Sequence, residues 1–424
     1  MRLLKVVNCL SESEAFRFVE KFKDEGVRLL KDLIKINTVV PPGNNYEEMV
    51  DFLEPIFSEL GFETERVVVP EEKVREIPFP LEGPRVNLVA RRGKGKPPLT
   101  LYAHMDVVPV EEEWSVPPFE GVVKNGRIYG RGAADMKGFI ATVLLALKVI
   151  HELGLEPNYD LTCVMCTDEE IGVYPGVYYL ADKGYIKGDV ICGEAAHGII
   201  GIGTAGAVQF KVTVKGKSAH TMMFFAAVNA VENTVPILEE LLKLKEKVME
   251  RRSEVPSIPT PLGDKMMPLF SINIISGGVK ENVIPSECRF AVDRRYIPEE
   301  DEEEVISEFM DAIEAGKARS KALSVEVNVI RSYKPFKTTT DNPIVKKLAA
   351  AVKHVTGNDP LFIGASGSTD MGYVAEKGHN IAIMGVGDLM SNFHGADESI
   401  KIEDMLNYAK ELIHLLCFQE EQST

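Results

Sequence analysis

The chain has 424 residues, enough for two domains, and its apolar (45%) and charged (26%) fractions are ordinary for a globular protein. Its formal net charge of −16 argues against a nucleic acid or an anionic membrane as a partner, because both would repel it. No apolar run approaches the ~20 residues of a membrane span, and residues 1–7 are too short and charged for a signal peptide, so we expect a cytoplasmic protein.

The first two hundred residues alternate between helix and strand patterns. Ser11, followed by acidic residues at 12 and 14, predicts the start of a helix. The mostly apolar segment 137–152 predicts a buried helix, and short apolar segments predict strands at 86–90, 99–103, 161–166 and 190–192. Such alternation predicts an α/β sheet that is covered by helices on both faces.

A different pattern begins near residue 207. Segment 208–214 alternates with period two, as expected of a sheet with one solvated face. The segments that follow predict a β-α-β-β-α-β order: a long helix at 226–251, a Pro-rich link at 256–261, strands at 269–275 and 287–292, an acidic helix at 299–316, and a strand at 324–330. This order is typical of a ferredoxin-like unit that buries its own core.

After residue 333 the α/β pattern returns, with a strand at 381–386 and a helix at 403–418. We therefore predict an α/β domain with a mixed sheet, into which an α+β ferredoxin-like domain is inserted. The predicted boundaries are 1–206 for the first part of the α/β domain, 207–331 for the insertion, and 332–424 for the second part.

Several of the predicted strands run into side chains that bind divalent metals. Ligand sites in open α/β sheets gather at the carboxyl ends of strands, where these side chains are expected to meet. Two imidazoles and three carboxylates, with one glutamate to spare, suffice to hold two divalent ions. The set predicts a two-metal hydrolase centre and comprises His104, Asp135, Glu169, Glu170, Glu194 and His394.

Local chemistry suggests a role for some of these residues. Asp106 shares a strand face with His104, so its carboxylate is expected to hydrogen-bond the ring and orient it toward a metal. The adjacent acids Glu169 and Glu170 would repel each other unless a cation lies beside them. Because their side chains point in different directions, one can bind metal while the other transfers a proton.

Other interpretations of the sequence are weaker. Cys163 and Cys166 form a CxxC, but residues three apart on a strand point to opposite faces, so we expect core cysteines. The GxGxxG at 201–206 lacks the following helix that a dinucleotide site needs, since a strand is predicted there. A glycosidase built on paired carboxylates would leave His104 and His394 without a role. A metal-binding protein without catalysis would be expected to have lost Glu169.

Together these segments resemble peptidase family M20, which includes aminoacylases, acetylornithine and succinyl-diaminopimelate deacylases, and glutamate carboxypeptidases. The resemblance extends to the His220 segment at 216–220, to residues 277–285, to Asp293-Arg294-Arg295, and to the Gly367-Ser368-Thr369-Asp370 loop. It implies a mixed-sheet di-metal hydrolase domain with an inserted lid and dimerisation domain. The implied reaction is hydrolysis of the amide bond of N-acyl amino acids or short peptides beside a free carboxylate, by a metal-bound hydroxide.

The resemblance also implies roles for individual residues. His104 and Glu194 would bind one metal, Glu170 and His394 the other, with Asp135 as the bridge. Glu169 would be the general acid/base, Asp106 would orient His104, and His220 would reach the active site of a second subunit in a homodimer. The substrate would be held by the remaining matched positions, with its carboxylate at Arg295 and Asn282 and its backbone at Gly367, Ser368 and Thr369.

The chain departs from the family pattern at three places. Ala195-Ala196 stands where Pro and Thr or Ser usually follow the glutamate, and an apolar Met-Met-Phe-Phe run at 222–225 follows His220. Thr204-Ala205 replaces the basic residues of bacterial succinyl-diaminopimelate enzymes. The loss of these basic residues disfavours a dicarboxylic succinyl substrate. A succinyl-diaminopimelate or acetylornithine deacylase is therefore kept as the alternative function and is not the preferred one. For the two metals we favour zinc, with cobalt and manganese suited to the same ligands.

Overall fold

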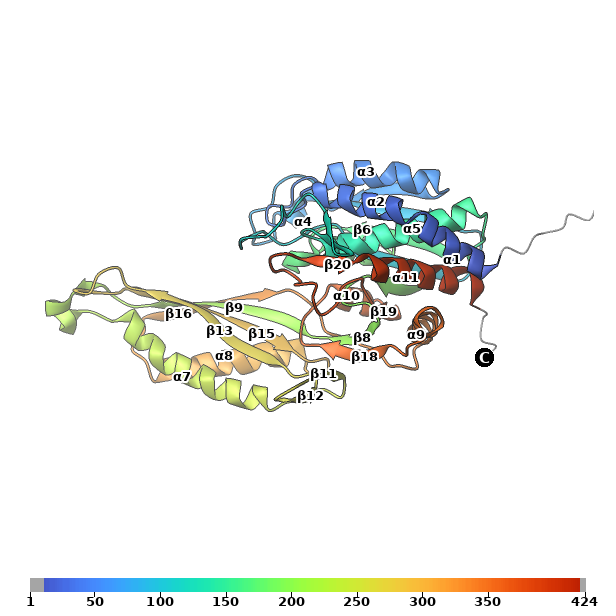
Figure 1. The fold of residues 1–424 in the computed structure, drawn as a ribbon. Helices are drawn as coiled ribbons and strands as arrows, with labels where there is room; N and C mark the ends of the chain where they lie inside the picture. The colour runs from blue at the N-terminus through green and yellow to red at the C-terminus, as the bar shows by residue number, and fades with distance from the viewer. Residues whose placement is uncertain (1–10, 420–424) are drawn as a thin grey trace, which may run out of the picture. The chain divides into compact units, whose positions relative to one another are not determined.

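The computed structural model describes residues 11–419, so the predicted absence of a signal peptide at residues 1–7 lies outside the described residues. The described chain divides into two compact units (Figure 1). The first comprises residues 11–202, 338–362 and 373–419, and the second comprises residues 203–337 and 363–372. Between residues 11 and 419, no helix combines the length and the apolar character needed to cross a membrane.

The first unit is a mixed sheet with helices packed against it. Its helices are α1 (Glu12–Lys21), α2 (Lys23–Lys35), α3 (Tyr46–Glu59), α4 (Glu71–Val74), α5 (Gly138–Glu152), α6 (Gly176–Asp182), α9 (Pro343–Thr356) and α11 (Ile402–Ile413), with the shorter turns η1 (Ala133–Lys137), η2 (Glu169–Ile171) and η4 (His414–Phe418). Its strands are β1 (Glu63–Val68), β2 (Val86–Arg92), β3 (Pro98–His104), β4 (Val122–Lys124), β5 (Arg127–Tyr129), β6 (Asp160–Cys166), β7 (Asp189–Cys192), β19 (Ile381–Ile383) and β20 (Ser399–Lys401). Three elements straddle the division: β8 (Ile199–Thr204), β18 (Leu361–Ala365) and α10 (Met371–Ala375).

The strand order β1-β2-β6-β3-β7-β19-β8 places four parallel strands at the centre of the sheet. Strand β3 runs parallel to both β6 and β7, and β19 runs parallel to β7. The outer neighbours β2 and β8 are antiparallel to β6 and β19. The carboxyl ends of the four central strands therefore lie along one edge of the sheet. The mixed sheet that the sequence predicted is confirmed.

Local chemistry explains where the helices begin and end. The Ser11 side chain accepts a hydrogen bond from the Glu14 amide and caps α1, whose acidic first turn suits the positive end of the helix dipole. Helix α9 starts with Pro343 after the capping Asn342, and it ends at Thr356 before the cap residue Gly357, whose φ of 75° glycine adopts without steric cost. Helix α5 is buried along almost its whole length, as its continuous apolar sequence predicted.

The second unit contains a four-stranded antiparallel sheet in the order β13-β15-β9-β16, with helices α7 and α8. Its elements are β9 (Gly206–Lys215), β10 (Ala219–His220), η3 (Thr221–Ala226), α7 (Ala230–Met249), β11 (Pro256–Thr260), β12 (Gly263–Lys265), β13 (Leu269–Gly277), β14 (Val283–Ile284), β15 (Glu287–Tyr296), α8 (Glu302–Ala318), β16 (Ser324–Arg331) and β17 (Phe336–Lys337). The main elements follow the predicted β-α-β-β-α-β order.

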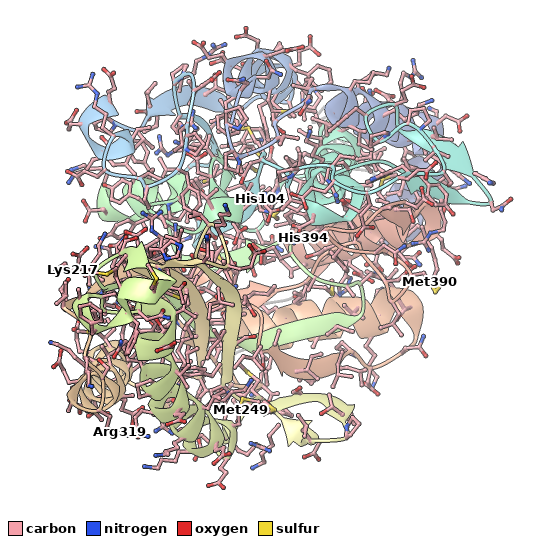
Figure 2. The ribbon with its side chains drawn as sticks, turned by 90° about the vertical axis from the view of Figure 1, so that its left-hand side faces the viewer. His104, Lys217, Met249, Arg319, Met390 and His394 are labelled. Carbon is pink, nitrogen blue, oxygen red and sulfur yellow. The ribbon has the colours of Figure 1, made fainter. Side chains whose placement is uncertain are left out.

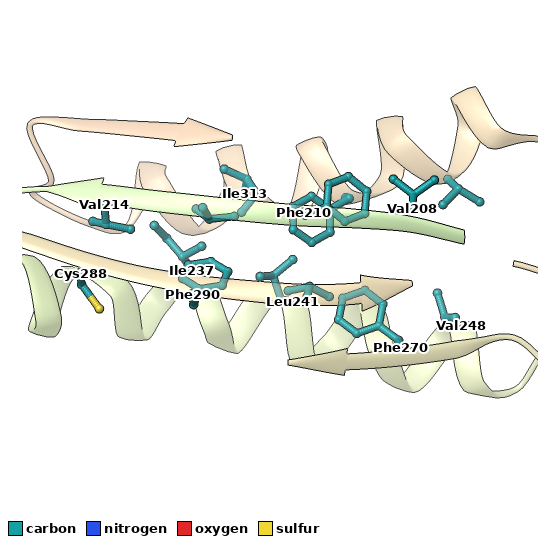
Figure 3. Packing of buried hydrophobic residues seen from close by; sticks show 14 of the residues in the cluster. Val208, Phe210, Val214, Ile237, Leu241, Val248, Phe270, Cys288, Phe290 and Ile313 are labelled. Atoms are coloured by element: carbon teal, nitrogen blue, oxygen red, sulfur yellow. The ribbon is translucent and has the colours of Figure 1, made fainter. Parts of the chain in front are cut away.

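Alternate residues of β9 form the centre of this unit's core (Figure 3). Val208, Phe210, Val212 and Val214 are all buried, and the Phe210 ring stacks on Phe309 of α8 with centroids 3.7 Å apart. One expectation was wrong: the Pro-rich segment near 256–261 is a β-hairpin of β11 and β12, because its prolines lie where a two-stranded ribbon does not need every amide.

The structure shows which elements contain the CxxC motif at 163–166 and the GxGxxG motif at 201–206. Cys163 and Cys166 are buried free cysteines on β6. Gly206, the last glycine of the GxGxxG, begins strand β9 rather than a helix. The phosphate-binding helix N-terminus of a dinucleotide site is therefore missing at this position.

Candidate metal centre

The residues predicted to bind metal converge at the carboxyl edge of the four parallel strands. His104 is the last residue of β3, and Glu194 follows β7. Glu170 lies in η2, just after β6, while His394 comes from the loop after β19. Neighbouring parallel strands thus deliver these side chains to one place, as the strand-end argument predicted.

Asp135 enters the same place from the turn that precedes α5. Its Oδ1 lies 3.0 Å from His104 Nε2, and its Oδ2 lies 3.1 Å from His394 Nε2. Figure 2 labels both histidines in this region of the first unit. A carboxylate that offers one oxygen to each imidazole has the geometry of a bridging ligand.

His104 belongs to two groups of three potential ligand residues. Within each group, the ligand atoms all lie within 4.8 Å of one another. One group adds Glu169 and Glu194, and the other adds Asp135 and Glu170. Glu170 Oε2 also lies 3.2 Å from His394 Nε2. The five predicted ligands and the predicted proton carrier Glu169 are therefore all brought together.

The excess of buried negative charge in this cluster favours the binding of cations. Burial and the nearby charge of Asp135 raise the pKa of Glu170 to about 7, and hydrogen bonds with Asp135 and Glu170 raise the pKa of His394 to about 10. Among the described residues, the buried Glu170 Oε1 has no hydrogen-bond partner. Buried carboxylates that outnumber the two imidazoles are costly unless a positive charge compensates them. The oxygen and imidazole donors therefore fit two divalent ions.

Asp106 contacts His104 differently from what we predicted. His104 Nδ1 lies 3.1 Å from the backbone carbonyl oxygen of Asp106, whereas the nearer carboxylate oxygen is 3.6 Å away, too far for a hydrogen bond. The carboxylate instead accepts a hydrogen bond of 2.9 Å from the Glu170 amide. Asp106 thus orients the ring through its carbonyl and fixes the Glu170 backbone through its side chain.

Comparison with known proteins identifies the family. Residues 100–417 match the model of peptidase family M20/M25/M40. The chain belongs to this family. It is therefore a hydrolase, related to metal-dependent peptidases and deacylases.

Relatives that match this M20 chain over nearly its whole length are described as a metallohydrolase or a desuccinylase. It is 28% identical to an uncharacterised metallohydrolase of Methanocaldococcus jannaschii, covering 93% of this chain and 99% of that one. It is 26% identical to a probable succinyl-diaminopimelate desuccinylase of Staphylococcus epidermidis, over 91% of this chain and 95% of that one. Its fold is similar to that of a dipeptidase of Saccharomyces cerevisiae, with a TM-score of 0.78, 18% identity, and coverage of 96% and 98%.

Glu398 is a residue of this M20 site that the sequence analysis did not assign. It is buried, and its two carboxylate oxygens accept hydrogen bonds from the amides of Gly132 (3.0 Å), Ala134 (2.8 Å) and Asp135 (3.1 Å). Arg131 Nη1 pairs with it at 2.7 Å. Glu398 therefore holds the turn that presents Asp135. Its position four residues after His394 was the only signal available in the sequence.

A second unassigned network supports Glu169 and Glu170. Asp168, with a φ of 63°, directly precedes them. Its carboxylate accepts hydrogen bonds from the Tyr46 hydroxyl (2.9 Å) and from Arg85 Nε (3.1 Å), and all three side chains are buried. Because these partners lie 122 and 83 residues away in the chain, no local pattern could have predicted the network.

The other predicted site residues lie in the second unit, where they form two groups. Asn282 Nδ2 lies 3.4 Å from Nε2 of the exposed His220, and His220 pairs with Val283 across β10 and β14. In the other group, Arg295 Nη1 donates a 2.9 Å hydrogen bond to Ser368 Oγ. Gly367 and Thr369 flank Ser368; the Gly367 carbonyl accepts from the Ala205 amide, and Thr369 Oγ1 accepts from the Met371 amide.

Proposed function

We propose that this protein is a two-metal amidohydrolase that cleaves N-acyl amino acids or short peptides at the amide bond next to a free carboxylate. The observation that supports this proposal most strongly is the position of Asp135, whose two carboxylate oxygens face His104 and His394. The carboxylates of Glu169, Glu170 and Glu194 lie in the same cluster. Family membership supports hydrolysis, and the full-length relatives described as a metallohydrolase and a desuccinylase support metal-dependent amide chemistry.

In this proposal each residue of the centre has one role. His104 and Glu194 would hold one cation, Glu170 and His394 would hold the other, and Asp135, which faces both histidines, would serve both. When bound, two divalent ions of the zinc, cobalt or manganese class would activate water and polarise the substrate carbonyl. We favour zinc, which metal analysis of the purified protein would test.

Glu169 is the proposed proton carrier. Glu169 is buried, with 5% of the residue exposed, and its carboxylate lies within the same group as His104 and Glu194, so it would border the reacting atoms. It would accept a proton from the attacking water and deliver it to the leaving nitrogen. Asp168, anchored by Arg85 and Tyr46, fixes the backbone from which Glu169 projects.

Arg295 is the proposed anchor for the substrate carboxylate. Its Nε pairs with Asp293 at 3.0 Å, which leaves the Nη1 edge, now hydrogen-bonded to Ser368, to receive a carboxylate. Asn282, whose amide lies 3.4 Å from His220, would add a second donor from the partner subunit. The Gly367-Ser368-Thr369 loop beside Arg295 would contact the substrate backbone.

We also propose a homodimer in which His220 completes the active site of the partner subunit. Strand β13 is an edge of its sheet, and it exposes Ile274 and Ile275. An exposed apolar edge strand is a natural surface for pairing with a second copy.

A mixing experiment tests this arrangement. Glu169→Gln and His220→Ala are each expected to be inactive alone. After subunit exchange, half of the dimers pair the two variants, and one of their two sites is intact, so about a quarter of wild-type activity returns. A mixture that stays inactive despite mass-spectrometric detection of the mixed dimer would refute the shared site.

The function itself is tested with a substrate panel on metal-depleted and metal-reloaded enzyme. Acetyl-amino acids, succinyl-amino acids and dipeptides are compared, and the metal-depleted enzyme is expected to be inactive. Glu169→Gln should retain both metal ions yet lose at least ~100-fold in kcat. Normal turnover of this variant, or turnover that survives metal removal, would contradict the proposal.

A desuccinylase is the second candidate, favoured by the 26% identical relative described as one. The second unit favours a less acidic substrate. Thr204 and Ala205, which stand where bacterial succinyl-diaminopimelate enzymes have basic residues, are buried and uncharged. Succinyl substrates that outperform acetyl substrates in the panel would reverse this preference.

A further inference from the structure

A cluster of Glu12, His354 and His414 lies in the first unit and shares no residue with the groups around His104. Glu12 is the first residue of α1, His354 lies near the end of α9, and His414 begins η4 after α11. Helices α1 and α9 both pack against α11 (Figure 1), which brings these distant parts of the chain together.

The three side chains present their ligand atoms to one another. Glu12 Oε2 lies 2.8 Å from His354 Nε2, and Glu12 Oε1 lies 2.5 Å from His414 Nδ1. All three potential ligand atoms fall within 4.8 Å. The two imidazole rings stack with centroids 4.1 Å apart, so both nitrogens approach the carboxylate from neighbouring positions.

We propose that Glu12, His354 and His414 form a binding site for a divalent transition-metal ion, separate from the catalytic centre. The arrangement repeats the pattern of Asp135, a carboxylate placed between two imidazole nitrogens. Two imidazoles and one carboxylate, with water in a fourth position, are a ligand set that zinc accepts. Copper and nickel ions suit the same donors.

The exposure of the cluster allows an ion to enter. The side chains of His354 and Glu12 are 45% and 24% exposed, whereas that of His414 is 13% exposed. Zinc ligands at ~2.0–2.2 Å from the metal stand roughly 3.3 Å apart in a tetrahedron, so the nitrogen–oxygen distances must widen by about half an ångström or more. The exposed His354 side chain and the partly exposed Glu12 side chain can supply this movement, while solvent provides the remaining ligand.

The position of the site gives it a structural role. Its ligands join α1, the first described helix, to α9 and to η4, across 342 and 402 residues of sequence. The Lys410–Glu20 ion pair, at 2.6 Å, already joins α1 to α11 independently of the histidines. An ion bound only by the folded chain would add to this connection and raise the melting temperature.

Zinc binding to the holoenzyme tests the proposal. Wild-type protein carrying its catalytic metals is dialysed against zinc at about 100 μM, a concentration at which a micromolar site is saturated, and bound zinc is measured by elemental analysis. His354→Ala and Glu12→Gln should each bind one zinc fewer per chain than wild type. The matched control His151→Ala, an exposed histidine of α5, should bind as many as wild type.

Thermal unfolding supplies the second measurement. Added zinc should raise the Tm of the metal-loaded wild type and of His151→Ala by about 3 °C or more, but not that of His354→Ala. Equal zinc content and equal Tm shifts in wild type and His354→Ala would overturn the site. The comparison is a difference between variants, so it holds even if the catalytic centre proves to bind a different number of ions.

Discussion

The buried Arg85–Asp168 pair offers a quantitative test of how the site is supported. Arg85 Nε lies 3.1 Å from Asp168 Oδ2, and the two side chains are 0% and 1% exposed. Arg85 also donates to the carbonyl oxygens of Pro42 (2.7 Å), Glu82 (2.5 Å) and Gly83 (2.9 Å). Arg85→Met would therefore leave the buried Asp168 carboxylate without its positively charged partner, and would remove the donor to these three carbonyl groups.

Breaking such a pair costs about 3–5 kcal/mol, since the remaining charge stays buried without compensation. Native proteins are stable by only ~5–15 kcal/mol, so the free energy of unfolding of Arg85→Met should fall by roughly a fifth or more. The control is Arg91→Met, which breaks an ion pair with Glu65 of the same 3.1 Å length but with side chains 37% and 46% exposed. Its expected cost is below about 1 kcal/mol.

Urea unfolding of the metal-loaded variants, followed by far-ultraviolet circular dichroism, measures both costs. The turnover number of Arg85→Met should also fall, because Asp168 holds the backbone in front of Glu169. Similar unfolding free energies for the two variants, or a cost below about 1 kcal/mol for Arg85→Met, would refute the reasoning.

Three further predictions address other parts of the molecule. Glu398→Gln should weaken metal binding about 10–100-fold in equilibrium dialysis, since it loosens the turn that presents Asp135; unchanged metal affinity would argue against this support. Phe210→Ala should lower the free energy of unfolding by about 3–5 kcal/mol, because it empties the centre of the second unit's core. Burial alone would lower the pKa of His197, but its hydrogen bond and charge interaction with Glu411 raise it above the ordinary value. Protonated His197 therefore stabilises the folded state, fully below about pH 6.5, and this contribution is lost as the pH rises through the raised pKa. The urea midpoint of the wild type should fall between about pH 6 and pH 9 for this reason, and His197→Gln should show a smaller fall. A variant with the wild-type pH profile would exclude His197 as its source.

The parts of the site that were predictable follow from local rules. Apolar strands that end at His104, or shortly before Glu170 or Glu194, can be recognised one at a time, and parallel pairing brings their ends to one edge of the sheet. The alternating sequence of β9 and the capped start of α1 are likewise local patterns.

The unpredicted parts depend on contacts between distant residues or on side-chain geometry. Glu398 reaches the Asp135 amide across 263 residues, which no spacing rule anticipates. Whether Asp106 orients His104 by its carboxylate or by its carbonyl depends on a difference of 3.6 Å against 3.1 Å. The β11–β12 hairpin was missed because prolines usually mark links, whereas a two-stranded ribbon tolerates them.

Anomalous diffraction at the zinc edge, from crystals grown with saturating zinc, tests the central claim most directly. We expect two peaks about 3.5–4 Å apart, each about 2.0–2.2 Å from its ligands. His104 and Glu194 should contact one, Glu170 and His394 the other, and Asp135 both. A map with no zinc among these five side chains, while zinc binds elsewhere on the chain, would contradict the account.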